Sequence, residues 1–172
     1  MRGGKRGAVM EKMRETIIRL LKEDARYTPR PIAKMTSFPE ADVAAEIGAM
    51  EREGVIVKYA AVVNLEKAAE DSVQALIELK VAPQKLKGFD AVASELAACP
   101  EVSSLYLMSG GFDLAVFLEA RSLSEIARFV SEKLSAIDGV IVTATHFILK
   151  KYKIEGQNTA GAEPSGRLPV HA

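Results

Sequence analysis

The side chains best suited to bind a small charged molecule gather in one short turn, residues 109–113. Two successive glycines, Gly110 and Gly111, would let a ligand approach the backbone closely and would leave amide N–H groups to bind a carboxylate. The carboxylate of Asp113 could bind the ammonium group of the same ligand. The alternative is a plain hairpin turn in which Asp113 is only solvated, and the residues by themselves leave this alternative open.

The chain offers little else for catalysis or metal binding. It has a single cysteine, Cys99, so no intramolecular disulfide can form and a cysteine-based zinc site is unsupported. Two histidines, His146 and His171, are too few for a histidine-rich metal site. No pair of nucleophile and base is visible, so we expect no enzyme, no metal and no cofactor. His146 lies in a predicted strand, as either a half-buried structural residue or an effector contact.

Charge is balanced over the whole chain but not along it. The 172 residues carry 23 basic and 23 acidic side chains, a formal net charge of zero, so no global positive field indicates a nucleic-acid partner. Residues 1–36, however, hold ten basic and four acidic side chains, a net charge of +6. Residues 37–54 hold one basic and five acidic side chains, a net charge of −4. Neutrality therefore does not exclude binding to DNA.

Helical patterns fill the first third of the chain. Apolar residues recur at helical spacing over residues 10–24. Thr28 and Pro29 are typical of a helix start, as an N-cap hydroxyl and a first-turn proline. Ser37 and Glu40 have the spacing of a capping box, which predicts a third helix from there to residue 54.

A strand is predicted after these helices, because residues 55–64 are rich in β-branched side chains. Three short helices followed by a strand is the layout of a winged helix-turn-helix. The turn between the second and third helices is only about three residues, residues 36–38, which favours this motif over a generic helical bundle.

A winged helix-turn-helix gives each candidate DNA contact a role. Basic residues around the second helix should contact phosphates, and the third helix should enter the major groove. The predicted groove face of the third helix (Asp42, Ala45, Glu46 and Ala49) holds no cation, so base reading there is the weak point of the hypothesis. The candidate DNA contacts are Arg26, Thr28, Arg30, Lys34, Ser37, Asp42, Glu46 and, from the wing, Lys58.

Beyond residue 72 the pattern becomes β-α-β-β-α-β. Alternating or β-branched stretches predict strands over residues 73–81, 102–108, 112–118 and 140–149, with helical stripes over residues 89–97 and 122–137. Right-handed crossovers then give a four-stranded antiparallel sheet with both helices on one face, the ferredoxin-like plan. The other face would carry apolar residues and would suit a partner sheet from an identical chain. These residues are Leu76, Tyr106, Met108, Phe117 and Val142, or their alternates.

The predicted fold class is therefore α+β, with four parts along the chain. These are a flexible basic arm (1–9), a winged helix-turn-helix with its linking strand (10–64), a second domain (65–154) and a disordered tail (155–172). The apolar runs are far shorter than the ~20 residues needed to span a bilayer. The N-terminus does not look like a secretory signal, so we expect a cytoplasmic protein without a membrane partner.

Three motifs give the chain a resemblance to the Lrp/AsnC family of feast/famine transcription regulators over about residues 10–153. Residues 49–56 (AMEREGVI) resemble the end of the family's third helix, in which Leu-Glu and a basic residue precede Gly and Ile. Residues 107–114 (LMSGGFDL) are similar to its Gly-x-aromatic-Asp turn. Residues 143–146 (TATH) resemble its threonine-rich final strand.

This resemblance implies a function and a set of partners. The family's ferredoxin-like domain, called RAM, pairs its sheets into dimers, which assemble further into tetramers or octamers. Amino acids bind between dimers beside the hairpin turn. The implied effector contacts are Ser109, Gly110, Gly111, Phe112, Asp113, Thr143, Thr145 and His146.

The leading hypothesis is thus an oligomeric regulator that binds double-stranded DNA and senses an amino acid or a related small metabolite. The acidic third helix motivates a second hypothesis, a sensor that binds DNA weakly and assembles with a related regulator. A remote third hypothesis is an enzyme like the siroheme decarboxylases, which share the two-domain layout.

Overall fold

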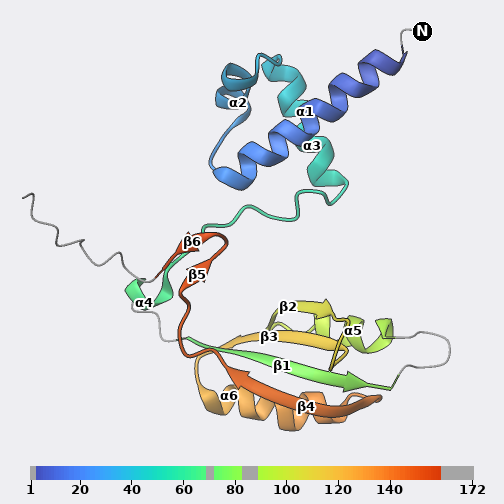
Figure 1. Cartoon of the computed structure of the whole chain (residues 1–172), viewed down its shortest axis with the longest axis vertical. Helices are drawn as coiled ribbons and strands as arrows, with labels where there is room; N and C mark the ends of the chain where they lie inside the picture. Colours follow the sequence, from blue (N-terminus) through green and yellow to red (C-terminus); the bar gives the residue numbers. More distant parts are fainter. Residues whose placement is uncertain (1–2, 69–71, 83–88, 160–172) are drawn as a thin grey trace, which may run out of the picture. The chain divides into compact units, whose positions relative to one another are not determined.

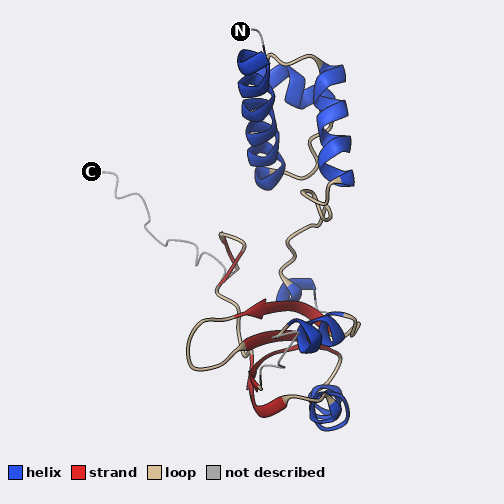
Figure 2. Ribbon diagram, turned by 90° about the vertical axis from the view of Figure 1, so that its right-hand side faces the viewer, coloured by secondary structure: helices blue, strands red, loops and turns tan. Residues whose placement is uncertain are grey.

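The structure is a computed structural model that describes residues 3–68, 72–82 and 89–159. The chain divides into two units, Met1–Val62 and Val63–Ala172, and each has an apolar core of its own. Helices alone form the first unit, whereas the second combines helices with a sheet, as the colours of Figure 2 show. This architecture confirms the predicted α+β class.

Three helices build the first unit: α1 (Gly3–Glu23), α2 (Pro29–Thr36) and α3 (Glu40–Arg52). Each helix turns one apolar stripe inward, because its apolar residues recur every three or four positions. The residues that meet in the core are Met13, Ile17, Leu20, Ile32, Val43 and Met50.

A tight turn joins α2 to α3 and gives the unit its helix-turn-helix. Thr28 occupies the N-cap of α2 and Pro29 its first turn, although the Thr28 hydroxyl caps no backbone N–H. Ser37 ends α2 in the left-handed conformation, with φ at 63°, and its backbone N–H donates to the Ala33 carbonyl at 3.0 Å. Only residues 37–39 separate the two helices.

Three local predictions for this unit are wrong. The flexible arm is helical from Gly3, because a helix nucleated by the amphipathic segment extends backward at little cost; residues 1–2 lie outside the described residues. The capping box does not form: Ser37 closes α2, and Pro39 precedes α3 instead. Residues 55–64 form no strand, because no described segment pairs with them, and Val57 is 87% exposed.

The second unit is a sheet of four antiparallel strands (Figure 1) in the order β2-β3-β1-β4. These strands are β1 (Val73–Val81), β2 (Val102–Leu107), β3 (Leu114–Ala120) and β4 (Val140–Phe147). Helix α5 (Asp90–Ala97) links β1 to β2, and α6 (Leu123–Arg128) leads from β3 through a π-helical and a 3-10 turn toward β4. A short helix, α4 (Leu65–Ala68), precedes β1. The predicted ferredoxin-like plan is confirmed.

Alternation along β1 separates the two faces of the sheet. Ala75, Ile77, Leu79 and Val81 are buried against α5 and α6. The residues between them lie on the opposite face, where the register pairs Leu76 with both Phe117 and His146. Apolar side chains on that outer face are exposed, as predicted; Tyr106, 54% exposed, meets the edge of the Phe117 ring.

The predicted disordered tail begins with structure. Strands β5 (Lys153–Ile154) and β6 (Gln157–Asn158) pair as a small hairpin, whose turn contains Gly156 at a φ of 82°. The tail prediction is therefore wrong for this segment, because a glycine that accepts positive φ lets the chain fold back. Residues 160–172 lie outside the described residues. None of the described helices has the length and apolar character needed to cross a membrane.

Candidate functional site

One arginine of α1 binds a carboxylate of α3 and a second carboxylate that directly follows α3. Arg14 places Nε 2.5 Å from Oε1 of Glu46 and Nη1 2.9 Å from Oε2 of Glu53. Hydrogen bonds to Glu53 and Glu46 raise the pKa of Arg14 above its ordinary value. Two of the five acidic residues in segment 37–54 thus share one compensating positive charge within the unit.

The expected place of Glu46 on the groove face is therefore wrong. Its side chain is turned toward α1, and only 7% of the residue is exposed. The reason is helical phase: Glu46 lies three residues after Val43 and four before Met50, both of which are buried. The role of Arg14 could not be predicted, since nothing in the sequence pairs it with residues 32 and 39 positions away. Asp42, in the first turn of α3, is exposed, and Ala45 is exposed too.

Two cations of α2 share an exposed face. Arg30 and Lys34 are one helical turn apart and lie opposite the buried Ile32. Within the described parts of the chain, neither forms an ion pair. Both charges are available to an external anion.

Arg26 is in a different position, because its guanidinium binds the Asp24 carboxylate at 2.7 and 2.9 Å. These hydrogen bonds lower the pKa of Asp24 to about 2. The pair is locally neutral, so Arg26 contributes less net attraction to phosphate than Arg30 does. Thr28, Ser37 and Lys58 are exposed.

In the second unit, Asp113 anchors the turn to β1. Its Oδ2 accepts a hydrogen bond from the Val81 backbone N–H at 2.8 Å, and its own N–H donates to the Leu79 carbonyl at 2.8 Å. The carboxylate is thus neither merely solvated nor wholly available to a ligand. Gly110 has a φ of 153°, a conformation that favours glycine, and Ser109 and Gly111 are exposed beside it.

The predicted effector contacts of β4 fall on two faces. Thr143 pairs with Leu79 and Thr145 with Ile77, so both lie on the helix-covered face. His146 lies on the outer face, with Nε2 3.5 Å from Oε1 of Glu78. Leu79 also pairs with Leu114, so Thr143 is at the same end of the sheet as the 109–113 turn. The eight residues therefore do not converge on one point within a single chain.

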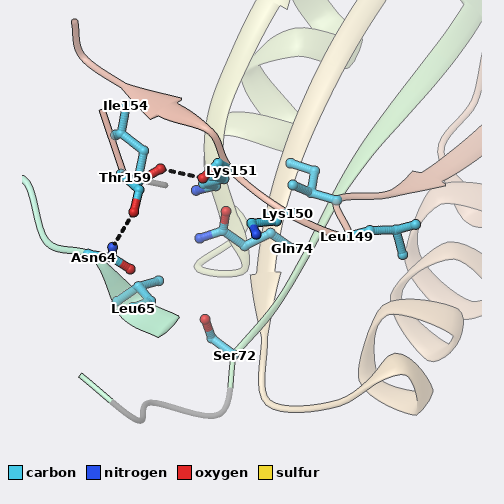
Figure 3. A pocket seen from close by; sticks show the side chains of 10 residues that line it. Asn64, Leu65, Ser72, Gln74, Leu149, Lys150, Lys151, Ile154 and Thr159 are labelled. Carbon is cyan, nitrogen blue, oxygen red and sulfur yellow. Dashed lines mark hydrogen bonds between the residues drawn. The ribbon is translucent and has the colours of Figure 1, made fainter. Parts of the chain in front are cut away.

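A cavity of about 140 Å³ lies elsewhere in the second unit and includes none of the predicted effector contacts (Figure 3). Asn64 donates to the Thr159 carbonyl at 3.0 Å, and the Thr159 hydroxyl donates to the Lys151 carbonyl. No group of three or more possible metal ligands occurs among the described residues. The residues around the cavity are Asn64, Leu65, Ser72, Gln74, Ile148, Leu149, Lys150, Lys151, Ile154 and Thr159.

The sequence of this chain is similar to a known family model and to known proteins. The family model described as the Lrp/AsnC ligand binding domain matches residues 74–157. An uncharacterised HTH-type transcriptional regulator of Bacillus subtilis, YugG, is 44% identical over 90% of this chain and 93% of its own. An uncharacterised HTH-type regulator of Pyrococcus abyssi is 36% identical over 81% of this chain and 85% of its own.

Solved structures show the same fold at lower identity. Transcriptional regulator NMB0573 of Neisseria meningitidis, in complex with L-Met, is 22% identical with a TM-score of 0.66, over 83% of this chain and 92% of that one. AsnC of Escherichia coli is 18% identical with a TM-score of 0.62, over 83% of this chain and 94% of that one.

Proposed function

This chain belongs to the Lrp/AsnC family of HTH-type transcriptional regulators, and we propose that it binds duplex DNA through α2 and α3 and senses an amino acid or a related small metabolite through its second unit. One observation supports DNA binding: α2 exposes Arg30 and Lys34, while the single charge of Arg14 is shared by Glu46 in α3 and Glu53 at its C-terminal end. The surface that meets phosphate is thus less acidic than the sequence indicates. This weakens the case for a regulator that has lost its DNA affinity.

The effector half rests on the 109–113 turn. The amides around Gly110 and Gly111 are donors for a carboxylate, and Thr143 lies at the same end of the sheet. Asp113 shapes the turn through Val81 and has one further carboxylate oxygen to offer an ammonium group. The neighbour NMB0573, whose structure holds L-Met, supports an amino acid as the ligand class. His146 faces the other side of the sheet, so a role for it requires a second chain.

The outer sheet face supports an oligomer. Leu76, Tyr106 and Phe117 form an apolar surface that is partly exposed in the single chain, and a second sheet of the same kind would cover it. We propose a homodimer through this face, with further assembly into tetramers or octamers. The cytoplasmic location stays a prediction. The enzymatic alternative is set aside, since the relatives are transcriptional regulators.

Salt dependence tests the DNA half. Fluorescence anisotropy of a labelled random-sequence duplex, titrated with the full chain at increasing salt, should give an affinity that falls linearly on a double-logarithmic plot. Arg30→Gln with Lys34→Gln should reduce that slope by about 1.8, because two phosphate contacts are lost. The matched control is Arg121→Gln with Lys153→Gln, two exposed cations of the second unit. Absence of binding at low salt would refute the proposal.

The effector and the dimer need separate measurements. A thermal-shift screen of the free amino acids, read together with light-scattering mass, should find a ligand that raises the melting temperature or changes the mass. Phe117→Lys should convert the dimer to monomers by placing a charge on the outer face, whereas Leu123→Lys, on exposed α6, should leave the mass unchanged. A monomeric wild type would contradict the dimer.

A further inference from the structure

The exposed face of α3 carries a single long polar side chain along its midline. With 3.6 residues per turn, Ala41, Ala45, Gly48 and Arg52 fall on one line along the helix. This line lies opposite the buried Val43 and Met50. Its first three members have no side-chain atom beyond Cβ, so the Arg52 guanidinium is the only hydrogen-bonding side chain on it.

The two acidic neighbours of Arg52 are engaged elsewhere. Glu51 accepts a hydrogen bond from the Tyr59 hydroxyl at 2.9 Å, and Glu53 binds Arg14 at 2.9 Å. Across residues 3–68, 72–82 and 89–159, no carboxylate forms an ion pair with Arg52. Its charge is therefore unneutralised although it stands between two glutamates.

Gly48 gives the guanidinium room to lie back along the helix. An ideal Cβ on Gly48 would lie 3.3 Å from Nη1 of Arg52, tighter than nine in ten Cβ contacts in proteins, so the end of this flexible side chain would have to move by a few tenths of an ångström. The backbone of Gly48 does not require glycine, because its φ is not positive. Glycine is among the least favourable residues in a helix interior. The absence of a Cβ at Gly48 therefore lets the Arg52 guanidinium lie close to the helix surface.

We propose that Arg52 is the base-reading side chain of α3 and recognises guanine in the major groove, an inference that rests on the proposed DNA-binding function. A guanidinium donates two parallel hydrogen bonds to O6 and N7 of guanine, and no other base pair edge offers this pair of acceptors. The alanines on the same line would add contacts to thymine methyl groups and would not compete for polar contacts. In the sequence, Arg52 stands in an acidic run, Glu51-Arg52-Glu53, which does not indicate a base contact.

The experiment begins with the full chain and a random pool of duplex DNA, from which bound sequences are selected. Affinities for the selected duplex and for a scrambled one are then measured by anisotropy for wild type, Arg52→Lys and Arg52→Gln. Arg128→Lys, an exposed arginine on α6, is the matched control. Arg52→Lys keeps the charge but loses the planar fork. It should weaken binding to the selected duplex by roughly 5- to 150-fold and leave the scrambled duplex within about twofold.

A change in the DNA supplies the second arm. Replacing single guanines of the selected site by 7-deazaguanine removes the N7 acceptor without touching the phosphates. At the contacted guanine, wild type should lose affinity, whereas Arg52→Gln should be insensitive to the replacement. Circular dichroism of each variant establishes that the helices are intact.

Three other results would contradict the proposal, and they distinguish a failure of DNA binding from a failure of base reading by Arg52. If wild type binds no duplex at low salt, the DNA-binding function itself fails. If wild type binds and selects a sequence that the Arg52 variants also select with unchanged affinity, the function stands and the role of Arg52 is refuted. If Arg52→Gln weakens both duplexes equally and lowers the salt slope by about one, Arg52 contacts a phosphate and reads no base.

Discussion

Arg14 of α1 and Glu46 of α3 are joined through a contact of 2.5 Å between Nε and Oε1, across 32 residues of sequence. This ion pair joins the first helix to the third and engages the Glu46 carboxylate inside the first unit. The same guanidinium also holds Glu53. The acidity of the third helix is therefore in part compensated from outside that helix.

Arg14→Met should lower the melting temperature of the first unit, because the buried Glu46 carboxylate loses its counter-charge. The same variant should weaken binding to random duplex DNA, since the first unit loses one positive charge beside two carboxylates. Arg19→Met is the control, because Arg19 is exposed on the same helix and is 3.9 Å from its only paired carboxylate, Glu23. Replacing both partners, Arg14→Met with Glu46→Leu, should restore most of the lost stability. Equal melting temperatures for Arg14→Met and Arg19→Met would show that the Arg14–Glu46 ion pair does not stabilise the first unit.

Acid should release the Asp24–Arg26 pair at an unusually low pH. The folded-state pKa of Asp24, about 2, lies below the ordinary value of 3.8. The pair therefore stabilises the fold fully above about pH 4, and this contribution is lost as the pH falls toward 2. Carboxyl NMR titration should give a pKa near 2 in wild type and a higher pKa in Arg26→Ala, in which only the backbone N–H of residue 26 still donates to Asp24. A wild-type value already near 3.8 would show that the pair does not persist in solution; Arg128→Ala serves as the control.

Gly48→Ala should change stability and DNA recognition in opposite directions. Alanine in a helix interior favours folding by about 0.5–1 kcal/mol over glycine, so the melting temperature should rise. The added Cβ, 3.3 Å from Nη1, should shift the Arg52 guanidinium by a few tenths of an ångström and weaken binding to the selected duplex slightly. Ala127→Gly, on exposed α6, should lower stability without altering that affinity. A variant that is stabilised and binds the selected duplex unchanged would remove the steric account of Gly48.

Asp113→Ala should loosen the end of β1 before any ligand is added. Loss of the hydrogen bond from the Val81 N–H should cost about 1–2 kcal/mol, since this donor is buried and would be left without a partner. Hydrogen exchange at the Val81 amide should accelerate accordingly. Asp113→Asn keeps an acceptor oxygen and should lose less, and Asp138→Ala, at an exposed position, should leave the exchange rate unchanged. Unaltered exchange in Asp113→Ala would assign the carboxylate to the ligand alone.

Much of the fold could be predicted because its signals are local and periodic. The alternation of Ala75, Ile77 and Leu79 predicts both the strand and its buried face, and the helical recurrence of Met13 and Ile17 predicts α1. The wrong predictions concern a strand that lacks a pairing partner and a residue that suits either of two neighbouring helix ends. The β-branched residues 55–64 have the composition of a strand but no described partner, and Ser37 could close one helix or open the next.

The sequence by itself determined the two-unit α+β architecture, the family and the turn at residues 109–113, since these depend on patterns that neighbouring residues carry. Only the tertiary structure decided how the charges are used. It turned Glu46 inward to Arg14, committed one oxygen of Asp113 to Val81, and left Arg52 unpaired between two engaged glutamates. The physical reason is that the partner of a charged side chain depends on helix phase and on contacts between segments far apart in the sequence. The distribution of charge along the chain does not specify these contacts.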